Sequence, residues 1–361
     1  MNVPVAKIAL LGSGTVGLAV LRRLEKWQGS PLGDQLRLVF AANTRMALQN
    51  VEGLDPRDCA QLLPGACRTA ARRTADPLPA LGADGIRILI DATADAGTAS
   101  RHAACLSAGV HVATACKLAT GTSLDLWQTI RDACRSSQTG FGDRATVGAG
   151  LPLLRTIREL RAGGDNIHAI AGVMSGSLAW LFHHFDGSRP FSSLVWEARD
   201  AGFTEPDPRE DLSGEDVRRK IVILARAAGF AIDNGQVDVR SLVPEALAAA
   251  PAELVDAGLG LLDEPLAELL ATAKAKGHSL RFVARLEGGR ARVGLEALAP
   301  NDPLNGGGGT DNRVAIWSDR YDRQPLVIQG PGAGAEVTAA ALLDDVLHLR
   351  ALAIGSVRHA A

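Results

Sequence analysis

The chain has 361 residues, enough for two domains of ordinary size, and 47% of them are hydrophobic, as in soluble globular proteins. Its net charge of −2 and its aromatic content of only 4% argue against a nucleic-acid partner and against an anionic membrane surface. The five cysteines show no C-x-x-C spacing, which argues against a disulfide framework or a zinc site and favours a cytoplasmic location. The N-terminus lacks the basic region, long apolar core and cleavage site of a signal peptide.

Apolar runs alternate with helical patterns in the first half of the chain. This alternation predicts an α/β fold with a doubly wound parallel sheet of the Rossmann type. The segment 46–81 is polar, contains prolines and is weakly patterned. Strands are expected at 5–11, 36–42, 85–94 and 111–115, and helices at 18–27, 99–108 and 123–136.

The pattern changes after residue 147, where strands joined by short turns predict a mixed or antiparallel sheet. Helices are expected at 153–161, 177–185 and 192–201, and strands at 167–174, 281–286, 292–298, 314–317 and 325–329. The segment 336–349 is helical with one apolar face, and we expect it to fold back onto the first domain. The predicted domains are therefore 1–147, joined by a returning C-terminal helix within 335–361, and an α+β domain at 148–334.

A glycine-rich loop follows the first predicted strand and opens the first predicted helix. Gly12 permits a tight turn, Gly14 lets the backbone approach a pyrophosphate, and Gly17 lets the helix pack on the strand. With Thr15 and Val16 they predict a dinucleotide-binding loop, in which N–H groups at the start of the helix face a phosphate. A glycine-rich turn without a ligand is the alternative.

The residues after the second predicted strand bear on the choice of cofactor. A carboxylate at this place would hold the ribose 2′-hydroxyl of NAD. The chain has Asn43 there, followed closely by Arg45, and a guanidinium favours a 2′-phosphate. The pattern therefore predicts NADP, with NAD as the alternative cofactor and a solvated surface arginine as the other interpretation of Arg45.

Six carboxylates stand within residues 205–216, and Lys220 follows Asp216 at the i,i+4 spacing of a helix. Three structural interpretations are open: a capping box at 213–216, a surface ion pair, and a loop containing prolines. The functional interpretation is a site for a small amino acid. Asp216 would orient an ammonium or hydroxyl group, and Lys220 would exchange the proton as an alcohol becomes a carbonyl. A lysine base needs a lowered pKa, from burial or from a second cation such as Lys117.

Motifs along the whole chain extend this interpretation. They are GSGTVG at 12–17, HVATACKLA at 111–119, TVGAGLP at 146–152, TEPDPREDLSGEDVRRK at 204–220 and GPGAGAEVTAAA at 330–341. In these motifs the sequence resembles homoserine dehydrogenase, most closely the dehydrogenase half of bifunctional aspartokinase–homoserine dehydrogenases. The resemblance implies reversible NAD(P)H-dependent interconversion of L-aspartate 4-semialdehyde and L-homoserine, in threonine and methionine biosynthesis. It also implies a homodimer that pairs through the sheet of the second domain.

The resemblance assigns roles to individual residues. It implies that the catalytic residues are Lys220, Lys117 and Asp216. It implies that the substrate is bound by Glu205, Asp211 and Asp216. Besides the contacts of the glycine loop, the resemblance and the strand-end pattern together predict cofactor contacts at Asn43, Arg45, Thr93, Lys117 and Gly332.

Two positions depart from the family pattern. Cys116 replaces an asparagine amide by a thiol, a poor hydrogen-bonding partner, so we expect looser cofactor positioning or an oxidisable thiol. Arg144 stands where the family often has an acidic side chain that helps the carbonyls of Val147, Ala149 and Leu151 hold an alkali cation. Because an arginine would repel a cation, we expect no cation requirement, with the guanidinium in its place. These departures leave two alternatives: a catalytically weak dinucleotide-binding paralogue, or a dehydrogenase of another small hydroxy-amino acid.

Overall fold

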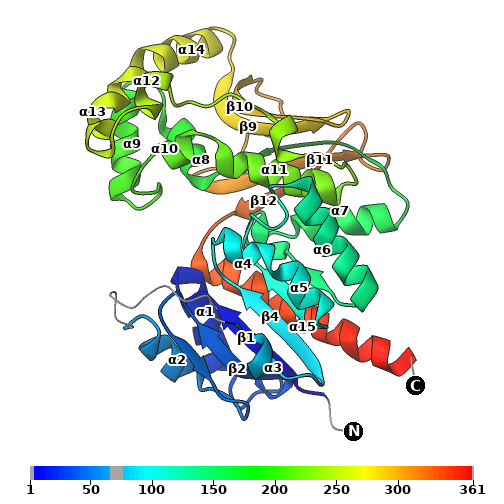
Figure 1. The fold of residues 1–361 in the computed structure, drawn as a ribbon. Coiled ribbons are helices and arrows are strands. Elements are labelled where there is room, and N and C mark those ends of the chain that lie inside the picture. The colour runs from blue at the N-terminus through cyan, green and yellow to red at the C-terminus, as the bar shows by residue number, and fades with distance from the viewer. Residues whose placement is uncertain (1–3, 66–75, 360–361) are drawn as a thin grey trace. The chain divides into compact units, whose positions relative to one another are not determined.

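Figure 1 shows the fold as a computed structural model that describes residues 4–65 and 76–359. Cys67 and part of the segment 46–81 lie outside the described residues. The chain divides into two compact units. Unit 1 comprises Met1–Gly150 and Ala333–Ala361, and unit 2 comprises Leu151–Gly332.

Among the described residues of unit 1, six strands form one sheet in the order β3-β2-β1-β4-β5-β6. Its strands are β1 (Ala6–Leu11), β2 (Leu36–Ala42), β3 (Ala47–Gln49), β4 (Ile86–Asp91), β5 (His111–Thr114) and β6 (Phe141–Gly142). The predicted parallel, Rossmann-type sheet is confirmed, except that the short edge strand β3 pairs antiparallel with β2. The central strands are buried almost throughout because helices cover both faces.

The helices of unit 1 pack on the two faces of this sheet. They are α1 (Thr15–Trp27), α2 (Pro56–Leu62), α3 (Leu78–Leu81), α4 (Ala96–Ser100), α5 (His102–Ser107), α6 (Leu124–Ser137) and α15 (Ala335–His359), with short 3-10 turns at Gly33–Gln35 and Arg144–Thr146. Apolar side chains of α1 and α15 form one core with the sheet, and those of α5 and α6 form the other. The single helix expected at 99–108 is wrong in detail, because the chain forms α4 and α5 with Arg101 between them.

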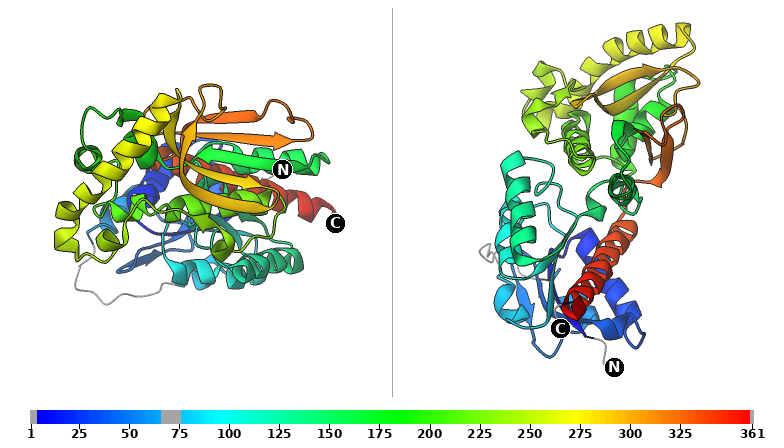
Figure 2. Two further views of the ribbon diagram at one scale, coloured as in Figure 1. Left: turned by 90° about the horizontal axis from the view of Figure 1, so that it is seen from above. Right: turned by 90° about the vertical axis from the view of Figure 1, so that its right-hand side faces the viewer.

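The C-terminal helix α15 belongs to unit 1 and lies along α1 and the sheet (Figure 2). Polar contacts fasten it there as well as apolar packing. Arg350 donates to the carbonyl of Pro4 at 2.8 and 3.1 Å and to Oε1 of Gln35 at 2.7 Å. The described helices include none with the length and apolarity that a membrane span requires.

The described residues of unit 2 form a second six-stranded sheet in the order β12-β11-β7-β9-β10-β8. Neighbours pair antiparallel except β10 and β8, so the mixed sheet predicted from the sequence is confirmed. The elements are α7 (Leu153–Ala162), β7 (Ile167–Val173), α8 (Gly176–His184), α9 (Phe191–Asp200), α10 (Arg209–Leu212), α11 (Glu215–Ala227), β8 (Asp238–Val239), α12 (Glu245–Ala248), α13 (Val255–Gly258), α14 (Asp263–Ala275), β9 (Ser279–Glu287), β10 (Arg290–Leu298), β11 (Asp311–Ser318) and β12 (Leu326–Pro331), with 3-10 turns at Asn234–Gln236, Ala252–Leu254 and Leu259–Leu262.

Helix α11 carries the end of the acidic motif, and its start differs from the prediction. The alternative interpretation of 213–216 as a capping box is wrong, because Gly214 is the N-cap residue and makes no side-chain cap. Ser213 is the C-cap residue of α10, and Gly214 follows with a left-handed φ of +77°. A side chain at Gly214 would also meet the ring of Phe282 at 2.8 Å, so the glycine both turns the chain and leaves room for the core.

Candidate functional site

A cavity of about 690 Å³ lies in unit 1 at the carboxyl ends of β1, β2 and β4. In a doubly wound sheet this edge is where dinucleotides bind. The predicted residues Gly12, Gly14, Asn43, Arg45 and Thr93 all line the cavity. The structure therefore brings together side chains and backbone from three separate loops, although their contacts with a cofactor stay predictions.

The glycine loop has the geometry that the sequence predicted. Gly12 has a left-handed φ of +97°, and a Cβ there would lie 2.7 Å from the carbonyl of Ala92. A Cβ on Gly17 would lie 1.9 Å from the carbonyl of Gly12, so helix and strand approach too closely for a side chain. Gly14 has open space beside it and, as the N-cap of α1, offers no side-chain acceptor to the first N–H groups at Thr15 and Val16. An anion fits such an uncapped helix start.

Asn43 has a structural role that its sequence position did not reveal. Its side-chain amide donates to Oγ of Ser13 at 2.9 Å and to the carbonyl of Leu63 at 2.8 Å. Its Oδ1 accepts from the N–H groups of Arg45 and Met46 at 2.8 and 2.9 Å. Both donors and both acceptor positions of the amide are thus used within the protein. Asn43 shapes the loop that presents Arg45, which is half-buried in the cavity wall.

Two charged residues missed by the sequence analysis also line the cavity. Asp95 caps α4, accepting from the N–H of Thr98 at 2.7 Å. Arg101, between α4 and α5, adds a second guanidinium to the wall that contains Arg45. The signal in the sequence was weak, because Arg101 lies in the first turn of the helix predicted at 99–108 rather than at a strand end.

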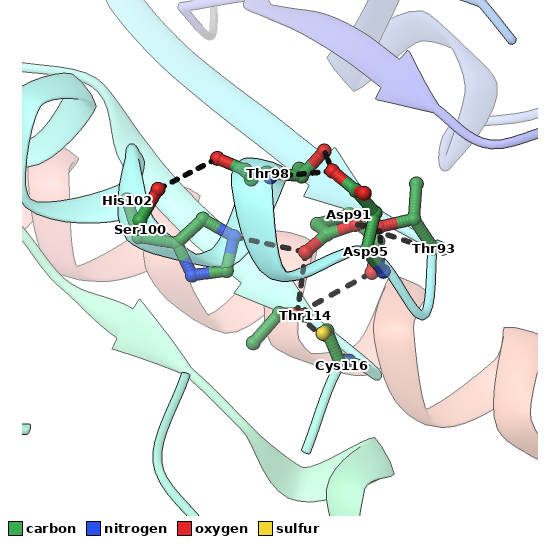
Figure 3. Close-up of polar contacts among 9 residues, drawn as sticks. Asp91, Thr93, Asp95, Thr98, Ser100, His102, Thr114 and Cys116 are labelled. Atoms are coloured by element: carbon green, nitrogen blue, oxygen red, sulfur yellow. Dashed lines mark hydrogen bonds and ion pairs between the residues drawn. The ribbon is translucent and has the colours of Figure 1, made fainter. Parts of the chain in front are cut away.

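Thr93 is held by a buried network at the end of β4 (Figure 3). Oδ1 of Asp91 accepts from the N–H and the hydroxyl of Thr93 at 2.9 and 2.7 Å. Oδ2 of Asp91 contacts Nε2 of His102 at 2.9 Å and the hydroxyl of Thr114 at 3.2 Å. The sequence did not connect Asp91 with His102 or Thr114, because only the fold brings β4, β5 and α5 together.

Cys116 lies directly after β5 and is 2% exposed. Burial raises the pKa of its thiol to about 11, with a smaller contribution from the nearby Asp91 carboxylate. Burial and the raised pKa argue against an oxidisable thiol, since oxidation follows thiolate character and exposure. The N–H of Cys116 donates to Oγ1 of Thr114 at 2.9 Å, so the backbone here is held without an amide side chain.

The predicted Asp216–Lys220 pair forms on α11 in unit 2, with 2.7 Å between Nζ and Oδ2. The Lys220 side chain is 9% exposed and the Asp216 side chain 43%, so the pair runs from the interior towards solvent. Nζ of Lys220 also donates to the carbonyl of Met174 at 2.7 Å. This burial argues against the interpretation as a surface ion pair, because burying an ammonium requires compensating contacts. The loop carrying Lys117 belongs to unit 1, so its predicted role as a second cation stays a prediction.

Three other carboxylates of the acidic motif have different surroundings. Asp211 accepts from the hydroxyl of Ser177 at 2.7 Å and from the N–H of Glu205 at 2.8 Å, so it braces the loop. Asp207 pairs with Arg209, whose hydrogen bonds lower the pKa of that carboxyl. Glu205 is exposed. Substrate contacts of Glu205, Asp211 and Asp216 stay predictions.

Gly332 lies against a residue that the sequence analysis did not identify. A Cβ on Gly332 would lie 1.9 Å from Cγ of Asn312. Asn312 is 1% exposed and its Nδ2 lies 3.4 Å from the carbonyl of Met174, the same carbonyl that accepts from Lys220. Gly332, Asn312 and Lys220 are therefore neighbours around one carbonyl oxygen.

Arg144 does not present an unbalanced charge. Its guanidinium Nε pairs with Oδ1 of Asp345 at 3.0 Å, and its backbone N–H donates to Oδ2 of the same buried carboxylate at 2.9 Å. The prediction that it repels a cation therefore loses its electrostatic basis. Ala149 has a left-handed φ of +50°, which is uncommon for alanine. Whether the carbonyls of Val147, Ala149 and Leu151 bind a cation stays a prediction.

Comparisons with known proteins agree with these features. The family model described as homoserine dehydrogenase matches residues 152–347, and the model of its NAD-binding domain matches residues 12–141. Among solved structures, a protein of unknown function from Candida auris is 30% identical, with a TM-score of 0.85 over 95% of this chain and 98% of that one. A homoserine dehydrogenase from Thiobacillus denitrificans, at 21% identity and a TM-score of 0.75 over 98% of this chain and 75% of that one, shares the fold.

Curated relatives give the same family. A chloroplastic bifunctional aspartokinase/homoserine dehydrogenase 2 from Zea mays is 37% identical over 95% of this chain, which spans only 38% of that relative. A homoserine dehydrogenase from Paracoccidioides brasiliensis is 37% identical over 73% of this chain and 74% of its own length. The chain belongs to the homoserine dehydrogenase family.

Proposed function

We propose that this protein catalyses reversible hydride transfer between a nicotinamide dinucleotide and the pair L-homoserine and L-aspartate 4-semialdehyde. The observation that carries the proposal is the buried Lys220, held at 2.7 Å from both the Asp216 carboxylate and the Met174 carbonyl. A lysine in such a place can move a proton at a reacting oxygen. Family membership supplies the substrate class.

The proposed cofactor is NADP(H), with NAD(H) as the alternative. Its nicotinamide ring supplies or accepts the hydride when bound. The uncapped start of α1 beside Gly14 fits the pyrophosphate. Arg45 lines the cavity where β2 ends without a carboxylate, which suits a 2′-phosphate, and Arg101 adds positive charge elsewhere in the cavity wall. An archaeal homoserine dehydrogenase with the same fold was solved with NADPH, at 19% identity and a TM-score of 0.72 over 94% of this chain and 96% of that one.

The charges around Lys220 indicate which group donates the proton in each direction of the reaction. The Asp216 carboxylate favours the ammonium form of Lys220, which is the form that donates a proton. In aldehyde reduction, Lys220 would therefore protonate the oxygen that becomes the homoserine hydroxyl. In the reverse direction the lysine must first lose its proton, and the half-exposed Asp216 would offer a path to solvent. We propose Lys117 as a further cation at the reacting end of the cofactor.

The amino-acid part of the substrate would be held by the acidic motif. We propose that Glu205, exposed on its loop, and Asp216 accept from the substrate ammonium. Asp211 would act mainly on the loop, because it already accepts from Ser177 and from the N–H of Glu205. The division of labour is thus two carboxylates that bind, one that braces, and a lysine that moves the proton.

Assembly and location complete the proposal. A homodimer would pair through the sheet of unit 2, whose edge strand β12 has only one neighbouring strand among the described residues. The four described cysteines are unpaired thiols, which supports a reducing, cytoplasmic setting.

The test is a substrate-by-cofactor matrix, followed by the absorbance of the reduced cofactor. Aspartate semialdehyde should be reduced with NADPH, and L-homoserine oxidised with NADP. L-serine and L-threonine serve as substrate controls, and NADH and NAD as cofactor controls. Tight dinucleotide binding without turnover of either homoserine partner would instead favour a catalytically weak paralogue. Faster turnover of another hydroxy-amino acid would redirect the substrate assignment.

A further inference from the structure

A carboxylate and an imidazole are buried together beneath the cofactor edge of unit 1 (Figure 3). Asp91 is the last residue of β4 and His102 the first of α5, and neither is exposed to solvent. Nε2 of His102 lies 2.9 Å from Oδ2 of Asp91. Because a carboxylate accepts, the imidazole donates from Nε2.

The same carboxylate joins two loops. Its Oδ1 receives the N–H and the hydroxyl of Thr93, on the loop after β4. Its Oδ2 is 3.2 Å from the hydroxyl of Thr114, which in turn accepts from the N–H of Cys116, on the loop after β5. Movement of Asp91 would therefore disturb both loops at once.

The position in the sheet indicates which part of a dinucleotide these loops face. A Rossmann-type sheet binds one mononucleotide over each half, and the halves meet where the strand order reverses. With the order β3-β2-β1-β4-β5-β6, the loops after β4 and β5 belong to the second half. The adenosine half lies over β1 and β2, where Arg45 is found.

His102 is a poor choice for stability alone. Its Nδ1 is buried and has no hydrogen-bond partner in the described part of the chain. An unsatisfied buried polar atom costs about 1–3 kcal/mol, a penalty that an apolar side chain would avoid. The ring thus makes one polar contact, to Asp91, and packs beside Phe141 at 5.7 Å between centroids.

We infer that His102 is a positioning residue: by fixing Asp91, it orients Thr93 and the Cys116–Lys117 backbone for the nicotinamide half of the dinucleotide. The inference rests on the proposed dinucleotide function. His102 itself is fully buried and is not among the residues that line the cavity. Without its N–H, the buried carboxylate loses one donor and can rotate, so the hydroxyl and N–H of Thr93 no longer have a fixed direction.

The test compares three variants with the wild type. His102→Leu removes the donor while keeping an apolar filling, and His102→Gln offers an amide donor near the place of Nε2. His111→Leu is the matched control. It is a buried histidine on β5, but it accepts from the N–H of Gly140 at 2.8 Å at the opposite end of the strand from Thr114. Dissociation constants are measured for NADPH and for adenosine 2′,5′-bisphosphate, which carries only the adenosine half.

We expect His102→Leu to weaken NADPH binding about tenfold, or about 1.4 kcal/mol, and to change bisphosphate binding less than twofold. His102→Gln should recover most of the loss, and His111→Leu should leave both constants unchanged. Unchanged NADPH affinity in His102→Leu, or equal weakening of both ligands, would overturn the inference. A wild type that binds no dinucleotide would instead overturn the proposed function.

Amide hydrogen exchange in the cofactor-free protein gives a second reading that needs no ligand. His102→Leu should speed exchange at Thr93 and Cys116, and His111→Leu should not. If His102→Leu does not fold, Thr114→Val tests the same network at β5, because it removes the hydroxyl that accepts from the N–H of Cys116. It should give the same selective loss of NADPH affinity, and equal affinity to the wild type would count against the inference.

Discussion

Replacing Lys220 by methionine tests the proposed proton transfer with little change of shape. Methionine has nearly the same length, so no large cavity forms in the 9%-exposed site. The Met174 carbonyl loses its 2.7 Å donor, a loss of about 1–3 kcal/mol for a buried acceptor. Removing a buried ammonium relieves a desolvation penalty of several kcal/mol, which offsets that loss.

Stability should therefore change by no more than about 2 kcal/mol, a Tm shift of a few degrees. Asp216 contributes little to the change, because its side chain is 43% exposed and can be solvated by water. The rate should behave differently. A positioned acid–base group contributes about 10²–10⁴-fold, so kcat for aspartate semialdehyde reduction should fall by that factor, equivalent to about 2.7–5.5 kcal/mol in the barrier.

Initial rates with NADPH, a thermal melt and an NADPH binding titration together decide the outcome. We expect a large loss of kcat, a nearly unchanged melt and unchanged cofactor affinity. Lys276→Met, at an exposed lysine after α14, is the matched control and should keep full activity. A Lys220→Met enzyme within tenfold of the wild-type kcat would refute the assigned role, because the proton would then be transferred without the lysine.

Three further outcomes are expected. Arg45→Ala should raise KM for NADPH at least tenfold and leave KM for NADH within twofold, measured by steady-state kinetics, because it removes a cation from the cavity wall. Gly332→Ala should lower kcat and destabilise unit 2 by about 1–3 kcal/mol in urea melts, because its Cβ would lie 1.9 Å from Cγ of the buried Asn312. Alkylation of Cys116 by iodoacetamide, followed by peptide mass spectrometry, should be negligible at pH 8. The raised pKa of about 11 keeps the thiol protonated there, so labelling should rise only as the pH approaches that value.

Each of these outcomes has a clear contrary. Equal effects of Arg45→Ala on both cofactors would point to a structural role for the arginine. A fully active Gly332→Ala enzyme would mean that Asn312 can move aside without disturbing Lys220. Gly308→Ala serves as its control among the glycines of unit 2, because no atom lies within 4 Å of the place its Cβ would take. Rapid labelling of Cys116 at pH 8 would show that the thiol is far more accessible than its 2% exposure indicates.

The predictions that held were those carried by local chemistry. Gly12 and Gly17 were predicted from the sterics of a strand–turn–helix, and each has a carbonyl oxygen where a side chain would stand. The Asp216–Lys220 pair followed from helical spacing and forms at 2.7 Å. Failures came where several local options had similar energies. Ser213 looked like a capping residue, but Gly214 takes that place because the chain turns there with a positive φ.

Long-range networks were beyond prediction because their members are far apart in sequence. Asp91, His102 and Thr114 meet only when β4, β5 and α5 assemble. Asn312 reaches Gly332 and the carbonyl of Met174 through the pairing of β11 with β7. No local sequence pattern around these residues predicts which distant residue each of them contacts.

The sequence by itself determined the longer strands of both sheets, the glycine-rich turn and the placement of an acid and a lysine on one helical face. These depend on backbone sterics and on a repeat of a few residues, which any short window contains. Only the tertiary structure decided that Lys220 is buried, that Asn43 is used to shape its loop, that Arg144 is balanced by Asp345, and that His102 stands beneath Thr93. The burial of a side chain and the balance of its charge depend on neighbours from distant parts of the chain, and only the fold brings those neighbours together.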